Sequence, residues 1–229
     1  MKAYLLFLFP ALTLLAADPE PDPKELPRIP FTAPKDALKT FTVKEGFELQ
    51  LAAAEPLVAD PVAMCFDEFG RLFVVEMIGY SERQHENLGR IRRLVDTNGD
   101  GHFDKSTIFA KGLAWPTALF CYNGGLFVGV TPDLFFFKDT NGDGVADSQK
   151  KVFTGFGKQR LNVQGIFNSL RWGLDNRIHG ATAHNGGSIT KPGKDGKALS
   201  LRGRDFSFDP RTLEMRAEGS TAQHGMSFD

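Results

Sequence analysis

The chain has 229 residues, with 27 lysines and arginines against 28 aspartates and glutamates, so its formal net charge is -1. Such a balance gives no global attraction to nucleic acid or to an anionic membrane surface, which excludes polyanion binding as the main activity. Much of the apolar bulk comes from phenylalanine, with 21 residues against 3 tyrosines.

Residues 1–17 are predicted to be a cleavable secretory signal peptide. They contain one lysine, an apolar run from Ala3 to Leu15, and the small residues Ala16 and Ala17 before an acidic stretch. A transmembrane anchor is the alternative, but about 13 apolar residues are too few to span a bilayer. No other apolar run is longer. We therefore expect no transmembrane helix and an exported protein, periplasmic or at the cell surface.

Residues 18–38 are predicted to form a linker. Six prolines fall within positions 18–34, which favours an extended polyproline conformation over a packed element. The folded part is expected to occupy residues 39–229.

From there on, short apolar runs alternate with turns rich in Gly, Asn, Asp and Pro. Five runs have the length and composition of strands: LFVVE (72–76), IRRLV (91–95), LFVGV (126–130), LFFFK (134–138) and DFSFD (205–209). Few segments show helical periodicity, so the predicted fold class is all-β.

The chain's two cysteines lie in such runs, Cys65 in MCF and Cys121 in LFCY. Export permits a disulfide, whereas free cysteine often serves as a small buried hydrophobe. The pattern favours two buried thiols over a bridge.

An internal repeat predicts the architecture. VAMCFDEFGRLFVVE (62–76) matches TALFCYNGGLFVGV (117–130) and LRWGLDNRIHGATA (170–183), and the chain ends on MSFD, which resembles the start of the same unit. The period is about 54 residues. Each unit reads as strand, tight turn, strand, longer loop, strand, turn and strand, which is the four-stranded blade of a β-propeller. A β-sandwich does not predict this similarity, so we expect about three blades of a larger ring.

Two acidic loops, DTNGDGHFD (96–104) and DTNGDGVAD (139–147), offer the oxygen ligands that calcium prefers. The candidate ligands are Asp96, Asn98, Asp100 and Asp104 in the first loop and Asp139, Asn141, Asp143 and Asp147 in the second. The twelfth position holds Thr107 or Lys150 in place of a bidentate glutamate, which predicts weak affinity, about 0.1–1 mM.

The alternative is a turn that uses Asn-Gly and Asp-Gly for their positive φ angles. Both loops are predicted to connect the third and fourth strands of a blade, far from the functional mouth. Any calcium there would be structural.

The mouth of a propeller is lined by residues just before the innermost strand and just after the second strand of each blade. In this chain those residues are Asp60, Trp115, Asn168 and His224 in the first set, and Glu76, Asp133, His184 and Asn185 in the second. His224 is the candidate general base, since imidazole accepts a hydroxyl proton near neutral pH. The alternative is a histidine satisfied by backbone carbonyls.

Two further expectations concern the substrate. Glu76 and Tyr80 are candidate hydroxyl-binding groups for a sugar. His184 and Asn185 are candidate substrate ligands at the start of the Gly- and Lys-rich loop 184–200, which is either a lid or a flexible insertion.

Several stretches resemble the N-terminal propeller of the membrane-bound dehydrogenase family of planctomycetes and verrucomicrobia, which is related to the quinoprotein glucose and sorbosone dehydrogenases. They are EPLVADPVAMCFDEFGRLFVVEMIGY, the two DTNGDG loops, SLRWGLDNRIHGATAHNGG, LRGRDFSFDPRTLE and AQHGMSFD. The resemblance implies a six-bladed propeller that oxidises a sugar or alcohol with pyrroloquinoline quinone and calcium, often followed by a cytochrome c domain.

In those relatives an Arg-Asn-x-Gln-Gly stretch lies near the cofactor. Here RLNVQG places Arg160, Asn162 and Gln164 as candidate cofactor ligands, although Leu161 stands where the arginine is expected. The alternative function is a non-catalytic propeller that binds a glycan or a protein.

Overall fold

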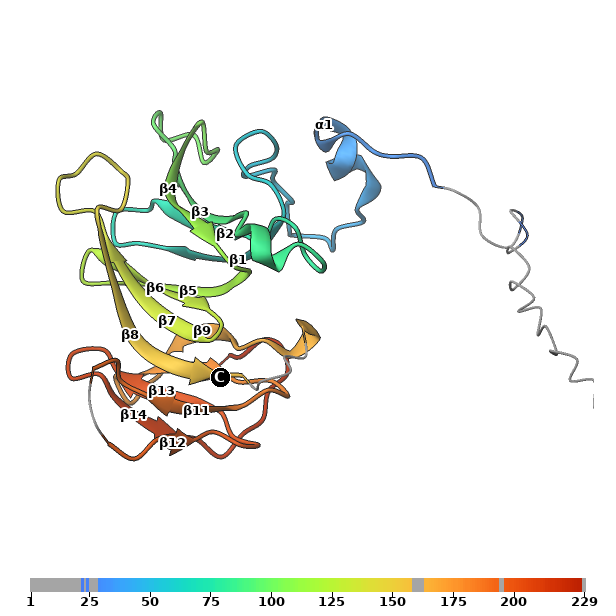
Figure 1. Ribbon diagram of the computed structural model, residues 1–229. Helices are drawn as coiled ribbons and strands as arrows, with labels where there is room; N and C mark the ends of the chain where they lie inside the picture. The colour runs from blue at the N-terminus through green and yellow to red at the C-terminus, as the bar shows by residue number, and fades with distance from the viewer. Residues whose placement is uncertain (1–21, 23, 25–28, 158–162, 194–195, 228–229) are drawn as a thin grey trace, which may run out of the picture. The chain divides into compact units, whose positions relative to one another are not determined.

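The computed structural model describes residues 22, 24, 29–157, 163–193 and 196–227 (Figure 1). It divides into two compact units, Met1–Thr42 and Val43–Asp229. The expected signal peptide lies outside the described residues. In the first unit, a one-turn helix α1 (Pro34–Ala37) and the 3-10 turn η1 (Leu38–Thr40) lie where an extended linker was expected to end. Proline suits the first position of such a helix, because it lacks an N–H that would have no partner there.

The second unit is all-β, and its described residues form fourteen strands in three antiparallel sheets, as the sequence predicted for the fold class. The first sheet runs in chain order through β1 (Pro61–Phe66), β2 (Leu72–Glu76), β3 (Gly89–Val95) and β4 (Lys105–Leu113). The second contains β5 (Pro116–Tyr122), β6 (Gly125–Val130), β7 (Asp133–Lys138) and β8 (Ser148–Phe156) in the same order. The third contains β9 (Asn168–Trp172), β10 (Ile178–Ala181), β13 (Phe206–Asp209) and β14 (Glu214–Ala217).

The repeated tight turn between the first two strands of each sheet has a chemical cause. Asn123 and Gly124 both have positive φ angles, 48° and 68°, which suit a two-residue hairpin between right-twisted strands. In the first sheet, Asp67 accepts hydrogen bonds from the backbone N–H groups of Phe69 (2.9 Å) and Arg71 (3.0 Å), which closes the equivalent turn.

The loop 184–200 differs from both expectations. It contains a hairpin, β11 (Gly187–Thr190) and β12 (Leu199–Ser200), and β11 pairs with β8, so the second sheet has six strands. Gly155 of β8 permits this pairing: its φ is +101°, and a Cβ there would collide with the carbonyl oxygen of Ser188. The hairpin is therefore an extension of the neighbouring sheet, not a lid.

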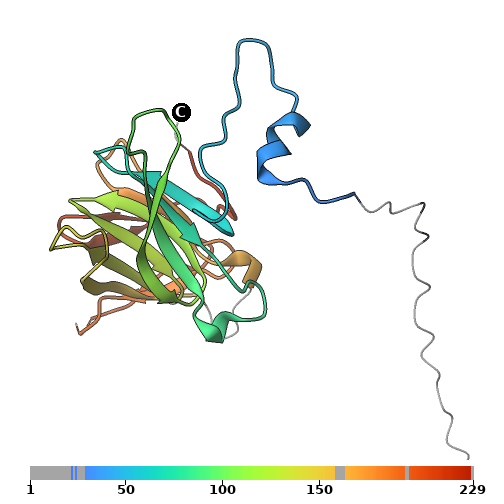
Figure 2. The same ribbon diagram turned by 90° about the horizontal axis from the view of Figure 1, so that it is seen from above.

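The three sheets stack in chain order, which gives a propeller-like arrangement (Figure 1). Seen from above, the strands of the stacked sheets overlap (Figure 2). Phenylalanine fills the space between the second and third sheets, where Phe156 stacks on Phe167 at 4.1 Å and Phe127 meets Phe208 edge-on at 5.0 Å. Another cluster, including Phe73, joins the first and second sheets. The first strands β1, β5 and β9 lie one beside the next.

A segment before β1 covers the outer face of the first sheet. Ala53, Leu57 and Val58 pack on Leu72 and Val74 there. The N–H of Phe103 donates to Ala52 (3.0 Å) just as the N–H of Ala146, its counterpart in the second acidic loop, donates to Phe109 of β4 (2.8 Å). Residues near Ala52 therefore contact the first sheet at the position where β4 contacts the second sheet.

Two short 3-10 turns, η2 (Gln84–Glu86) and η3 (Val163–Gly165), complete the described elements. No helix in the described part of the chain is long and apolar enough to cross a membrane.

Candidate functional site

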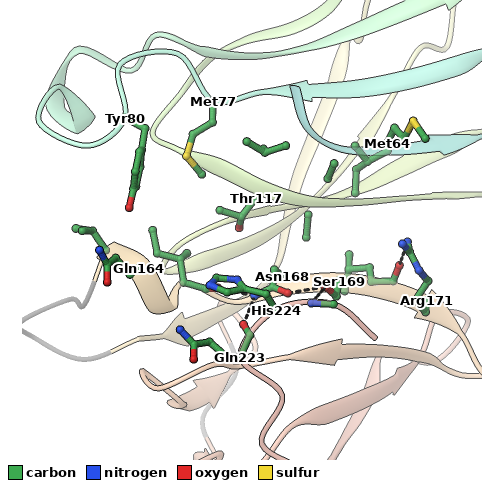
Figure 3. Close-up of a pocket in the computed structure, with 18 residues that line it drawn as sticks. Met64, Met77, Tyr80, Thr117, Gln164, Asn168, Ser169, Arg171, Gln223 and His224 are labelled. Atoms are coloured by element: carbon green, nitrogen blue, oxygen red, sulfur yellow. Dashed lines mark hydrogen bonds between the residues drawn. The ribbon is translucent and has the colours of Figure 1, made fainter. Parts of the chain in front are cut away.

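The starts of β1, β5 and β9 line a hollow of about 790 Å³, which we call the inner-strand hollow (Figure 3). The loop after β2, the turn η3 and the segment 223–225 complete its described lining. Its principal polar side chains are those of Tyr80, Gln164, Asn168, Arg171, Gln223 and His224. Residues far apart in sequence therefore meet here because neighbouring sheets begin at the same end of the stack.

His224 projects into the hollow (Figure 3). It is exposed, and no residue of the described chain hydrogen-bonds its imidazole, so the ring nitrogens are available to a ligand. The backbone on both sides of it is held: the Asn168 amide donates to the Gln223 carbonyl (2.9 Å), and the Gly225 N–H donates to the Ser169 hydroxyl (3.1 Å). A fixed backbone with a free ring is suited to presenting a base.

Asp205 was not among the site residues predicted from the sequence. Its side chain is completely buried, and its carboxylate accepts hydrogen bonds from the Thr182 N–H (2.9 Å), the Ser220 hydroxyl (2.7 Å) and the Ala222 N–H (2.8 Å). These bonds fix the segment that leads to His224. The available signal was an aspartate at the head of the otherwise alternating strand DFSFD.

Tyr80 and Gln164 also line the hollow. Tyr80 is 47% exposed, and its ring lies 5.3 Å from the ring of buried Trp115. Gln164 belongs to η3. Arg160 and Asn162, the other candidate cofactor ligands, lie outside the described residues.

Glu76 is placed differently from the expectation. Its carboxylate is fully buried, pairs with Arg90 and Arg92, and accepts the Ala59 N–H at 2.7 Å. A fully buried carboxylate that pairs with two guanidinium groups is not exposed to a substrate. Glu76 holds the entrance of β1 in place and does not line the hollow.

His184 and Asn185 are likewise outside the described lining of the hollow. Asn185 is buried, and its side-chain amide donates to the carbonyl of Gly165. His184 is exposed and packs beside Gly165. Both residues contact Gly165 of η3, the element that contains Gln164. Asp133 pairs with Lys151 (2.7 Å) and also lies outside the described lining.

The acidic loops connect β3 to β4 and β7 to β8, as predicted. They share one hydrogen-bond pattern. Asp96 accepts the N–H groups of Gly99 (2.7 Å) and Gly101 (2.8 Å), and Asp139 accepts those of Gly142 (2.6 Å) and Gly144 (2.8 Å). The Gly101 N–H is the main reason that the pKa of Asp96 lies below its ordinary value.

The closing aspartates act in the same way. Asp147 accepts the hydroxyl of Thr140 (2.8 Å), which lowers the pKa of Asp147, and Asp104 accepts the hydroxyl of Thr97 (2.6 Å). Among the described residues, no three acidic or histidine side chains converge on a metal position. The carboxylates thus serve the turns themselves, and the loops have calcium's donor types without a preformed cage.

Residues 33–229 match the protein family described as "Domain of unknown function (DUF7133)". The chain belongs to this family. No curated protein matches the chain in sequence.

Two solved structures share the fold: the calcium structure and the iodide structure of Trichoderma reesei Carbohydrate-Active Enzymes Family AA12. The first is 15% identical with a TM-score of 0.50, covering 76% of this chain and 40% of that chain. The second has the same identity and TM-score, with coverages of 75% and 41%. At this low sequence identity, the similarity shows a shared fold and nothing more. This chain spans about two fifths of the length of the solved chains.

Proposed function

We propose that the chain is part of an exported six-bladed propeller that oxidises a hydroxyl of a sugar or alcohol with a quinone, and that the inner-strand hollow is part of its substrate site. The observation that carries the proposal is that His224, Gln164 and Tyr80 line one hollow. The fold shared with structures of a carbohydrate-active enzyme family and the stretches that resemble the membrane-bound dehydrogenases support it.

Each of the three residues has a role in this proposal. His224 takes the proton of the substrate hydroxyl, because a neutral imidazole is a base near physiological pH. Gln164 and Tyr80 orient the substrate, since an amide and a phenol both hydrogen-bond hydroxyl groups and an exposed ring packs on a sugar face. A bound quinone would accept the hydride.

The described lining fits pyrroloquinoline quinone only in part. The quinone carries carboxylates, and Arg171, which donates to the Leu170 carbonyl (3.2 Å), is the cation among the described lining residues. No carboxylate is found among those lining residues, so they offer no calcium cage beside a quinone. We therefore assign no step to the cofactor beyond hydride acceptance.

This incomplete fit favours the second candidate, a propeller that binds a glycan or a protein without catalysis. The exposed ring of Tyr80 above an amide-rich wall, with Gln164, Asn168 and Gln223, is also suited to holding a saccharide.

A dye-linked oxidation assay on the full-length protein separates the candidates. With quinone and calcium added, wild type should oxidise at least one member of a sugar and alcohol panel. His224→Ala should lower kcat about 10²–10⁴-fold, as expected for loss of a general base. His85→Ala is the matched control, because His85 is an exposed histidine outside the described lining. Sugar binding by calorimetry without oxidation or quinone binding would favour the second candidate.

We also propose that the acidic loops bind calcium weakly in a structural role. Both loops present three alternating oxygen donors, and an affinity of about 0.1–1 mM suits extracellular calcium. CaCl2 at about 10 mM should then raise Tm by a few degrees, and Asp96→Asn with Asp139→Asn should abolish the rise. An equal effect of MgCl2, or no effect of CaCl2, would leave the loops as turns.

The proposal of export is based on the signal-peptide pattern of residues 1–17. The proposal of electron transfer to a cytochrome c domain is based on the family resemblance. Expression in a secreting host should release a mature chain that begins at Asp18, which intact mass measures. Retention of Met1 in the exported protein would contradict a cleaved signal.

A further inference from the structure

The two cysteines of the chain meet across a boundary between sheets. Cys65 lies on β1 and Cys121 on β5, and their Sγ atoms are 2.9 Å apart. They are 56 residues apart in sequence. Both side chains are partly buried and pack against the apolar cluster that joins the first two sheets. Two buried thiols were expected from the sequence, because free cysteine in an apolar strand often serves as a small hydrophobe.

A bond between Cys65 and Cys121 would have a structural effect, because the two residues lie on different sheets. β1 and β5 belong to different sheets, and no backbone ladder joins them. Packing alone therefore sets their separation. On the N-terminal side of the two cysteines, the same strands line the inner-strand hollow through Val62, Met64, Thr117 and Leu119.

We propose that Cys65 and Cys121 form a disulfide that joins β1 to β5 and fixes two walls of the hollow. A bond between sulfurs already in contact requires only a small movement of flexible side chains. The inference does not depend on the catalytic proposal, because the bridge would stabilise a binding protein equally.

The oxidant is an external disulfide, and the reaction is thiol–disulfide exchange. One protein sulfur, as thiolate, attacks the external disulfide, forms a mixed disulfide and releases one thiol. The second protein thiol then loses its proton and displaces the other external thiol as the Cys65–Cys121 bond forms. Two protein thiols are oxidised and one external disulfide is reduced to two thiols.

The contact between the two sulfurs also affects the reactivity of Cys121. The hydrogen bond with Cys65, with burial in second place, raises the pKa of the Cys121 thiol. A raised pKa lowers the fraction of Cys121 that is present as thiolate, and so slows the first exchange step when Cys121 is the attacking sulfur.

The test is peptide mapping of the purified chain after incubation with oxidised glutathione. The protein is unfolded in denaturant, treated with iodoacetamide and digested without reduction. We expect a linked peptide pair containing Cys65 and Cys121, with carbamidomethylation of both residues lost. Reduction with dithiothreitol should restore both modifications and lower Tm by roughly 5–10 °C.

Cys65→Ser and Cys121→Ser are the matched controls. Each should retain one thiol that accepts a single glutathione, and neither should show the Tm difference between oxidised and reduced protein. If a variant does not fold, the linked peptide from wild type alone decides. Full alkylation of both cysteines after oxidation, or two separate glutathione adducts on one chain, would overturn the proposal.

Discussion

At the scale of single residues, two buried carboxylates hold backbone segments next to the hollow. Glu76 holds the backbone before β1 through the Ala59 N–H, and Asp205 holds the segment before His224 through the Ala222 N–H. Each uses a carboxylate to satisfy backbone donors that would otherwise be buried without partners. Glu76 and Asp205 therefore position the backbone next to the hollow, although neither residue lines it.

Asp205→Asn should destabilise the protein. An amide replaces one acceptor oxygen with an NH2 donor group where three donors converge, so at least one buried N–H or hydroxyl loses its partner. We expect a loss of about 2–4 kcal/mol in the free energy of unfolding, measured in urea. Asp60→Asn makes the same change on an exposed side chain and should have little effect. Equal stabilities of the two variants would contradict this role for Asp205.

Asp209 gives a pH-dependent prediction. Hydrogen bonds from Arg211 lower its pKa from 3.8 to about 2. A carboxylate whose folded pKa is depressed stabilises the fold above its unfolded pKa, and this stabilisation is lost as pH falls through the folded value. The Tm difference between wild type and Asp209→Asn should be constant above about pH 5 and disappear between about pH 4 and pH 2. A difference that persists at about pH 2 would exclude the ion pair as its source.

At the scale of elements, glycine determines where the hairpin β11–β12 docks. Gly155 combines a positive φ with direct contact between its backbone and that of Ser188. Because any side chain would occupy the space of that carbonyl, the hairpin pairs with β8 only while the position is glycine.

Gly155→Ala should therefore displace the hairpin. Gly112→Ala is a close control, since Gly112 also has a positive φ, +76°, but no neighbouring atom lies within 4 Å of the place that a methyl group would take. We expect Gly155→Ala to cost about 1–3 kcal/mol more than Gly112→Ala in urea unfolding, and to speed amide hydrogen exchange in β11. Similar losses in the free energy of unfolding for both variants would show that the positive φ angle, and not the contact with Ser188, causes the destabilisation.

At the scale of the whole molecule, the first sheet exposes an apolar strand. Val62, Met64 and Phe66 of β1 are 51%, 60% and 58% exposed, and large contiguous apolar patches usually mark contact surfaces. Val62 and Met64 also line the inner-strand hollow, so in the six-bladed ring proposed above a further blade would cover Phe66 and border the hollow.

Met64→Ser with Phe66→Ser should reduce self-association of the 229-residue chain, measured by light scattering, and leave its Tm almost unchanged. Val145→Ser is the control, because Val145 is 44% exposed but lies alone on an acidic loop. In the full-length protein the double variant should lower Tm. No change in that protein would argue against a covered β1 face.

The sequence by itself determined the all-β class, the strand runs, the place of both acidic loops and the gathering of His224 with Tyr80, whereas Gln164 was a candidate only through the family resemblance. These follow from local rules: alternation, turn residues, and a repeat that places equivalent positions at one end of a stack. Tertiary structure alone decided the burial of Glu76, the role of Asp205, the docking of the loop 184–200 and the contact between Cys65 and Cys121. Each of these depends on which backbone or side chain from another sheet lies opposite, and no local pattern encodes that distance.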